Sequence, residues 1–251
     1  MSRRAKRANR PNPRVDRQPK ESIVIDINQY RKPKKKKIDI IPRNINQETY
    51  LEELDNMEKS IVFAVGPAGT GKTMLAAQWA IKMLWEGKYD KIVITRPNVA
   101  VDDKDIGFLP GDIFKKMTPW MLPLLDIFKE YYSLKEIEYL LTEEILEICP
   151  IAYIRGRTFK NSIVIVDEAQ GTSANSMLSI LTRIGENSKM VITGDMKQAD
   201  KGSSNGLQDF MDRTQGISST LQNISIVKFT NKDIERHKAV KEILSIYGQT
   251  N

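Results

Sequence analysis

Short apolar runs alternate with segments of helical periodicity between residues 38 and 251. The runs have the length of β-strands, are rich in β-branched residues and are apolar at nearly every position, which is typical of strands buried on both faces of a parallel sheet. They are Ile61–Val65, Lys91–Thr95, Ser162–Val166, Met190–Thr193 and Ile224–Phe229. We therefore predict an α/β fold, in which a mostly parallel sheet lies between two layers of helices and binds its ligand at the carboxyl ends of the strands.

Helical spacing is clearest directly after the first run. Leu75, Trp79 and Met83 recur on one face, and Gly87 can end that helix. Two further helices are predicted, one from about 174 to 184 and one from 231 or 233 to 247.

Residues 98–160 interrupt this alternation. They contain four prolines and an acidic-apolar stretch, from Leu134 to Ile148, that we interpret as helical. We interpret the segment as an insertion between core strands. A lid, a partner-binding surface and a nucleic-acid track are the roles that the sequence leaves open.

One segment fits the pattern G-x-x-x-x-G-K-[ST] at each fixed position: Gly66-Pro67-Ala68-Gly69-Thr70-Gly71-Lys72-Thr73. It follows a predicted strand and opens a predicted helix, the context that separates a phosphate-binding loop from an ordinary glycine-rich turn. In such a loop, backbone N–H groups surround the phosphates and the helix N-terminus adds partial positive charge. Lys72 is predicted to contact the β- and γ-phosphates, and Thr73 to offer its hydroxyl to Mg²⁺. We expect the chain to bind a nucleoside triphosphate.

Two carboxylates, Asp167 and Glu168, follow the third predicted strand. At the carboxyl end of a strand, Asp167 is predicted to reach the Mg²⁺ shell and Glu168 to accept a proton from the attacking water. The alternative is an acidic turn on the surface. Because one carboxylate suffices to hold the metal, the adjacent pair favours hydrolysis over binding alone.

Polar residues also follow two other predicted strands. Gln198 is predicted to sense the γ-phosphate, although in an isolated segment it would be interpreted as an ordinary loop glutamine. Arg96 can contact phosphate or nucleic acid, or only cap a carboxylate, and the sequence favours neither role.

Positive charge is concentrated at one end of the chain. Residues 1–37 hold 14 of the 39 Lys and Arg residues but only 3 of the 32 Asp and Glu residues, a net charge of +11, so residues 38–251 have a net charge of −4. The first 37 residues contain little to bury and are predicted to form a disordered basic arm. Such an arm can hold RNA or DNA through counterion release; the alternative is a solvated tail that aids solubility.

The remaining composition excludes several classes of protein. A single cysteine, Cys149, cannot form an internal disulfide framework and suits a reducing compartment. The longest apolar runs are too short to span a bilayer, and no apolar stretch follows the basic N-terminus to form a secretory signal. We therefore expect a soluble, cytoplasmic protein without a membrane partner. Since His237 is the only histidine, a histidine-rich metal site is excluded, and Mg²⁺ bound with the nucleotide is the metal expected.

The order of these motifs resembles the motor core of superfamily-one helicases, and the linking segments resemble the PhoH family of ATPases. The linking segments that carry the second likeness are Gly107–Asp112, Ile151–Thr158, Leu181–Gly185 and the late Asp233-x-x-Arg236-His237. The resemblance covers roughly residues 43–247. It implies a RecA-like P-loop NTPase core, ATP hydrolysis and a link to RNA or DNA.

Within this resemblance, Asn46-Gln47-x-x-Tyr50 is similar to the glutamine motif that reads adenine in related motors. A side-chain amide offers a donor and an acceptor to the adenine edge, so Gln47 is predicted to contact the base. The alternative is a glutamine at the start of a helix.

Two-domain helicases close the nucleotide between two lobes and supply an arginine from the second, which this chain lacks. A single lobe must take that arginine from a neighbouring subunit or do without it. Arg236 is the first choice and Arg183 the second, with Arg155 and Arg157 as further candidates; a surface ion pair is the alternative for each. A head-to-tail contact that closes forms a ring, so we predict a homo-oligomer such as a hexamer.

These features favour an Mg²⁺-dependent ATPase coupled to nucleic acid, with RNA favoured over DNA. The second hypothesis is a nucleotide-gated assembly protein with slow hydrolysis, which contacts its partner through residues 98–160. A small-molecule kinase fits less well, because Glu168 and Gln198 favour water as the acceptor.

Overall fold

The computed structural model describes residues 38–97, 121–198, 205–217, 220–235 and 238–246. The predicted basic arm, residues 98–120 of the predicted insertion, Arg236 and His237 lie outside the described residues, and the predictions made for them stay predictions.

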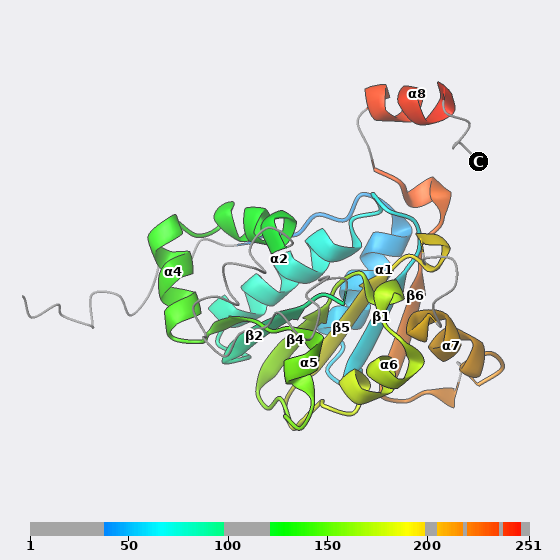
Figure 1. The fold of residues 1–251 in the computed structure, drawn as a ribbon. Coiled ribbons are helices and arrows are strands. Elements are labelled where there is room, and N and C mark those ends of the chain that lie inside the picture. The colour runs from blue at the N-terminus through cyan, green and yellow to red at the C-terminus, as the bar shows by residue number, and fades with distance from the viewer. Residues whose placement is uncertain (1–37, 98–120, 199–204, 218–219, 236–237, 247–251) are drawn as a thin grey trace, which may run out of the picture. The chain divides into compact units, whose positions relative to one another are not determined.

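Six strands form one sheet in which every pairing between the described strands is parallel (Figure 1). Their order in space is β3 (Leu146–Ile148), β2 (Lys91–Thr95), β4 (Ser162–Val166), β5 (Lys189–Gly194), β1 (Ile61–Val65) and β6 (Ile224–Lys228). Strand β5 therefore separates β1, which leads into the glycine-rich loop, from β4, which leads into the acidic pair. Because all strands run in the same direction, the segments that follow them meet at one edge of the sheet.

Successive residues of the central strands enter two different hydrophobic cores. In β1, Val62 and Ala64 pack into one core while Phe63 and Val65 pack into the other, and all four are buried. This alternation follows from the two-residue period of a strand. It explains why the central strands are apolar at nearly every position, since both of their faces are buried.

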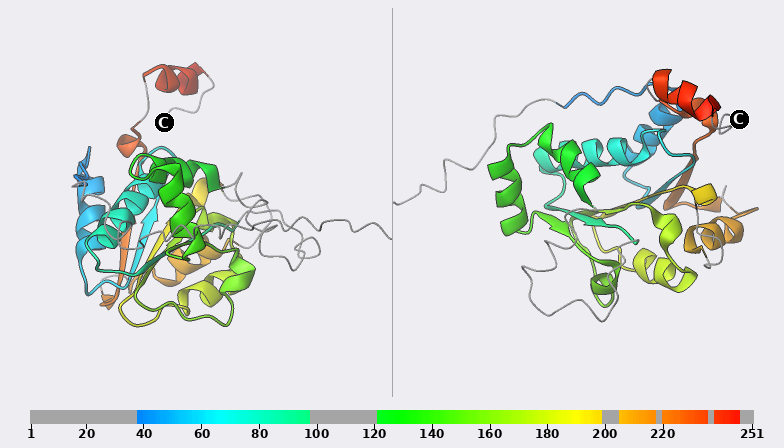
Figure 2. Two further views of the ribbon diagram at one scale, coloured as in Figure 1. Left: turned by 90° about the vertical axis from the view of Figure 1, so that its left-hand side faces the viewer. Right: turned by 45° about the horizontal axis from the view of Figure 1, so that its top comes forward.

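Helices cover both faces (Figures 1 and 2). One face carries α1 (Ile45–Asp55), α2 (Lys72–Trp85), a helix over residues 121–129 and α4 (Leu134–Thr142). The other carries α5 (Ile151–Ile154), α6 (Ala174–Leu181) and α7 (Gly206–Arg213). Further described elements are the 3₁₀ turns Ala169–Gly171, Met196–Gln198 and Asn231–Asp233 and helix α8 (Lys238–Ile246). The predicted three-layer α/β fold is confirmed, and its strand order is RecA-like.

The structure differs from the prediction over Leu134–Ile148. Helix α4 ends at Thr142, Glu144 adopts a left-handed backbone conformation with φ of 54°, and Leu146–Ile148 pair with β2 as an edge strand. The prediction of one continuous helix was wrong because short apolar stretches fit helical and strand spacing equally well. The segment interpreted as an insertion therefore contributes a strand to the sheet.

The two later helices are shorter than predicted. Helix α6 ends at Leu181 rather than near residue 184, and α8 begins at Lys238 after the 3₁₀ turn Asn231–Asp233. Among the described helices, none has both the length and the apolar composition that crossing a membrane requires.

Candidate functional site

The glycine-rich loop takes its shape from residues that tolerate positive φ. Gly69 and Gly71 have φ of 83° and 82°, and Gly71 directly precedes α2. A Cβ atom on Gly66 would lie 2.4 Å from the carbonyl oxygen of Phe229, so the loop can pack against the end of β6 only with a glycine at this position. The loop therefore sits between the end of β1 and the first turn of α2, as the motif predicts.

Lys72, in the first turn of α2, is buried against the loop. Its Nζ donates to the carbonyl oxygens of Gly66 and Pro67, both at 2.7 Å. Burial lowers the pKa of Lys72, while nearby carboxylates, Asp195 foremost, act in the opposite direction. A phosphate would offer this ammonium stronger, charged acceptors than two neutral carbonyls.

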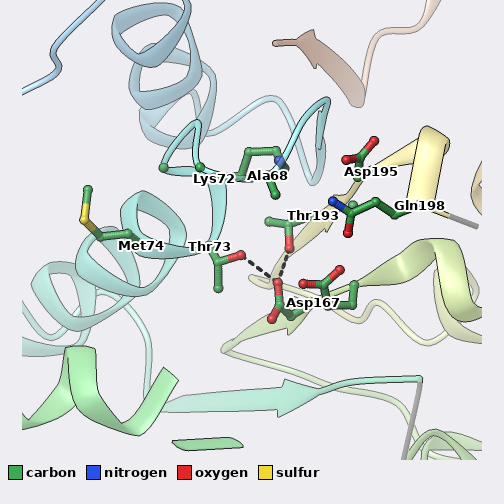
Figure 3. A pocket seen from close by; sticks show the side chains of 12 residues that line it. Ala68, Lys72, Thr73, Met74, Asp167, Thr193, Asp195 and Gln198 are labelled. Atoms are coloured by element: carbon green, nitrogen blue, oxygen red, sulfur yellow. Dashed lines mark hydrogen bonds between the residues drawn. The ribbon is translucent and has the colours of Figure 1, made fainter. Parts of the chain in front are cut away.

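Asp167, at the end of β4, accepts two hydroxyl hydrogen bonds on one oxygen. Thr73 Oγ1 donates to Asp167 Oδ1 at 2.7 Å, and Thr193 Oγ1 donates to the same oxygen at 2.6 Å. Figure 3 shows both threonines pointing toward the carboxylate. The structure thus brings together Thr73 and Asp167, the two residues predicted to hold Mg²⁺.

The donor set fits a hard cation that shares its ligands with a nucleotide. Hydroxyl and carboxylate oxygens are ligands that Mg²⁺ accepts, and Mg²⁺ commonly combines one or two protein oxygens with phosphate oxygens and water. Within the described part of the chain, no group of three or more His, Cys, Asp or Glu side chains could hold a metal by itself. Thr73 and Asp167 would therefore hold the ion together with the phosphates, whose negative charge it would neutralise.

Glu168 has a backbone conformation that is uncommon outside glycine. Its φ and ψ are 54° and 43°, in the left-handed region, and such conformations concentrate at functional sites. The carboxylate is engaged at both oxygens: Arg96 Nη2 donates to Oε1 at 3.1 Å, and Gln170 Nε2 donates to Oε2. Of the roles left open for Arg96, the structure shows carboxylate capping, because its Nε also lies 3.9 Å from Asp167 Oδ2.

One cavity of about 250 Å³ is lined by Lys72, Thr73, Asp167 and Glu168. Asp195 and Gln198, which follow β5, complete its wall opposite α2 (Figure 3). The lining residues are Ala68, Gly69, Gly71, Lys72, Thr73, Met74, Asp167, Glu168, Thr193, Gly194, Asp195 and Gln198. The predicted phosphate, metal, proton-acceptor and γ-phosphate-sensing residues therefore converge on a single space.

Gln47 lies behind the loop, in the first turn of α1. Its Nε2 donates to the carbonyl oxygen of Thr70 at 3.1 Å, and its Oε1 accepts from the backbone N–H of Arg43 at 2.8 Å. A Cβ on Gly71 would lie 3.1 Å from Gln47 Nε2, so the loop glycine also makes room for this amide. Gln47 is thus a residue at a helix start that also contacts the loop, and its contact with adenine stays a prediction.

The segment after β6 is bonded to the loop as well. Phe229 N–H donates to the carbonyl oxygen of Val65 at 2.7 Å, and Glu235 N–H donates to that of Gly69 at 2.9 Å. Asp233 Oδ2 accepts from Asn46 Nδ2 at 2.8 Å, which joins this segment to α1. Two elements distant in the sequence therefore hold the loop from outside the cavity.

None of the described candidates for a trans-acting arginine lines the cavity of its own chain. Arg157 forms a bidentate ion pair with Glu147 and lies 4.8 Å from the ring centroid of Phe159. Although burial alone would favour the neutral acid, hydrogen bonds from Arg157 and Lys91 lower the pKa of Glu147 to about 2. Arg157 is therefore committed to a structural ion pair, whereas Arg155 is exposed after α5 and Arg183 follows α6.

The sequence assigned no role to Thr193 or Gln170, both of which contact the acidic pair. Thr193 occupies a strand, where a β-branched threonine is expected on propensity alone. Gln170 follows the acidic pair, and its side-chain contacts depend on the position of β5. The one signal available in the sequence was that each has a polar side chain, a hydroxyl or an amide, close to the end of a predicted strand and next to another motif.

The family model described as PhoH-like protein matches residues 39–248. A PhoH-like protein of Bacillus subtilis is 42% identical over 193 residues, which cover 76% of this chain and 59% of the relative. Protein PhoH of Escherichia coli K12 is 38% identical over 213 residues, covering 83% and 58%. The chain thus spans about three fifths of the length of these curated relatives. Among solved structures, the Pif1 helicase of Candida albicans is similar with a TM-score of 0.41 and 16% identity, over 83% of this chain and 44% of that one.

Proposed function

The chain belongs to the PhoH family, and from that premise we propose that it binds ATP with Mg²⁺ and hydrolyses the terminal phosphoanhydride bond in a manner coupled to RNA or single-stranded DNA. The observation that carries the proposal is the convergence of Lys72, the Thr73–Asp167 pair and Glu168 on one cavity.

In this proposal each residue acts on a defined part of the nucleotide. Lys72 and the loop N–H groups bind the β- and γ-phosphates, and Thr73 and Asp167 hold the Mg²⁺ that neutralises them. Glu168 orients the attacking water and accepts its proton, and Gln198 contacts the γ-phosphate. Gln47 contacts adenine from α1. Arg236 of a neighbouring subunit, in a closed ring, would supply a further positive charge to the γ-phosphate.

Glu168 gives the most direct test of this assignment. Glu168→Gln keeps the size of the side chain but removes its basicity, so we expect ATP binding to be retained and hydrolysis to fall by about a hundredfold or more. Binding of a fluorescent ATP analogue and release of phosphate measure the two effects separately. Normal turnover by the variant would show that Glu168 is not the proton acceptor.

The coupling to nucleic acid rests on the basic residues of 1–37. We expect single-stranded RNA to stimulate ATP turnover, with a stimulation that weakens as salt rises and is lost in a 38–251 truncation, because counterion release drives such binding. Phosphate release with RNA, with single-stranded DNA and without either, at several salt concentrations, measures this.

A second function, a nucleotide-gated assembly protein with slow hydrolysis, is favoured by one observation. Both carboxylate oxygens of Glu168 already accept a hydrogen bond, from Arg96 and Gln170, which leaves fewer acceptor positions for water. Slow turnover that is indifferent to RNA and DNA, together with an ATP-dependent change of oligomeric state in light scattering, would support this second function over the first.

A further inference from the structure

Gln170 joins two strand ends through one side-chain amide. It lies in the 3₁₀ turn Ala169–Gly171 that follows β4 and the acidic pair, and only 5% of its surface is exposed. Its Nε2 donates to Glu168 Oε2, and its Oε1 accepts from the backbone N–H of Asp195 at 3.1 Å. The turn that begins at Asp195 carries Gln198, so the amide links Glu168 to the opposite wall of the cavity.

The orientation of this amide follows from its partners. An ionised carboxylate can only accept, and a backbone N–H can only donate. Only the arrangement with Nε2 toward Glu168 and Oε1 toward Asp195 satisfies both. The side chain therefore donates to a carboxylate and accepts from a backbone N–H at the same time. Neither a carboxylate nor an apolar residue of the same length can do both.

Gly194 leaves the space that this amide occupies. A Cβ atom at Gly194 would lie 2.9 Å from Gln170 Oε1 and 2.6 Å from Leu207 Cδ2. Real Cβ atoms do not approach other atoms so closely, so a side chain at this position would displace the amide or α7. The glycine in the segment Thr193-Gly194-Asp195 is thus explained by the Leu207 and Gln170 side chains packed against it rather than by backbone conformation.

We propose that Gln170 is a positioning residue for hydrolysis, which holds the Glu168 carboxylate toward the cavity and ties its position to the turn that carries Gln198. This inference rests on the proposed function, because it assigns Gln170 a role in the same reaction. Arg96 holds the other oxygen with a charged group, whereas Gln170 provides a neutral donor whose position depends on β5. A shift of the Asp195–Gln198 turn therefore moves the carboxylate that activates water.

Gln170→Glu tests the proposal, because it keeps the shape and the acceptor for Asp195 but replaces the donor to Glu168 by a second carboxylate. We expect kcat to fall at least about tenfold at pH 8 while KM for ATP changes less than about threefold. Two adjacent carboxylates repel each other, so the Glu168 side chain should leave the position that it holds beside Gln170. The loop and metal-binding residues are unchanged, so the loss should appear in kcat rather than in KM.

Gln170→Asn provides the uncharged comparison. The shorter amide cannot reach both partners, so kcat should fall with KM preserved although no charge is added. This variant decides the question alone if Gln170→Glu does not fold. The matched control is Gln208→Glu on α7, whose Nε2 donates to Asp212 Oδ1 at 2.8 Å and which does not line the cavity; its kcat should equal that of the wild type.

The outcomes separate this inference from the proposed function. A kcat within about twofold of wild type in either Gln170 variant overturns the positioning role, as does a KM for ATP that rises by as much as kcat falls. Absence of turnover in the wild type would instead refute the proposed function, on which the inference depends.

Discussion

Two buried lysines, one at each edge of the sheet, compensate for the loss of water in the same way, by donating to backbone carbonyls, but lie in different surroundings. Lys72 lies at the carboxyl edge and Lys189, the first residue of β5, at the amino edge; they are 7% and 1% exposed. Both ammonium groups donate to backbone carbonyls: Lys72 to Gly66 and Pro67, and Lys189 to Leu54 and Asn56 at 2.6 and 2.7 Å. Burial lowers the pKa of each.

What differs is the surroundings of the two groups. Lys72 borders a cavity and faces the carboxylates Asp167, Glu168 and Asp195. Lys189 is enclosed by the end of α1, and its Nζ lies 5.5 Å from the ring centroid of Trp79. An ammonium beside a cavity can exchange its carbonyl partners for a ligand, whereas an enclosed one can only hold its own chain together. Buried charge alone therefore does not identify a site; accessible space next to it does.

The largest expected effect separates the two lysines by function. Lys72→Ala removes the cation that faces the phosphates, so we expect ATP affinity to fall by roughly one to two orders of magnitude and turnover to be lost. Lys72 itself borders the cavity, so water can reach the space that its side chain leaves, and the unfolding free energy should change little. Calorimetric titration with a non-hydrolysable ATP analogue measures the affinity, and retained affinity would contradict the phosphate-binding role.

The next effect is on stability at the opposite edge. Lys189→Met leaves the carbonyls at the end of α1 without their donor, which should lower the free energy of unfolding by about 2 kcal/mol at neutral pH. Turnover per folded molecule should stay near that of the wild type, since the site is at the other edge. Urea unfolding measures the loss, with Lys135→Met, an exposed residue of α4, as the control. A Lys189→Met protein that is stable but inactive would contradict the comparison.

The smallest effect is a pH dependence carried by Lys189. Its pKa in the folded chain is about 8, against an ordinary value of 10.5, because burial disfavours the charged form. The folded state therefore releases the proton first, and between these values the unfolded chain binds more protons. The free-energy cost of burying the charged ammonium applies in full below pH 8 and decreases as the pH rises toward 10.5. The stability of wild type relative to Lys189→Met should accordingly increase by about 1 kcal/mol across this window.

Urea unfolding of both proteins at intervals across the same pH range gives the measurement. Lys135→Met relative to wild type provides the baseline for effects of pH on the rest of the chain. A constant difference between wild type and Lys189→Met would show that the ammonium is not desolvated in the folded chain.

Much of the fold is predictable because it depends on the pattern of residues that are neighbours in the sequence. Strands β1, β2 and β4 have the predicted bounds, since strands buried on both faces leave uninterrupted apolar runs. The glycine-rich loop and the acidic pair are equally local, each being a short motif beside a strand. Because parallel strands end at one edge, their convergence on one cavity follows from the fold class.

The unpredicted parts depend on contacts between distant segments. Strand β3 was interpreted as helix because Leu146–Ile148 become a strand only by pairing with β2. The bridge from Gln170 to Asp195 requires β5 to lie beside β4, and no spacing between residues in the sequence reports that order. The capping of Glu168 by Arg96 likewise depends on β2 and β4 being neighbours.

The chain that follows β6 is bonded to the glycine-rich loop at two points: Phe229 N–H donates to Val65, the residue before the loop, and Glu235 N–H donates to Gly69 within it. These two hydrogen bonds connect the backbone of the loop to the residues immediately before Arg236. A rotation of the Gly69 peptide that accommodates a ligand must carry Glu235 with it or break its hydrogen bond. A ligand that moves the loop can therefore change the position of Glu235 without any change in the sheet.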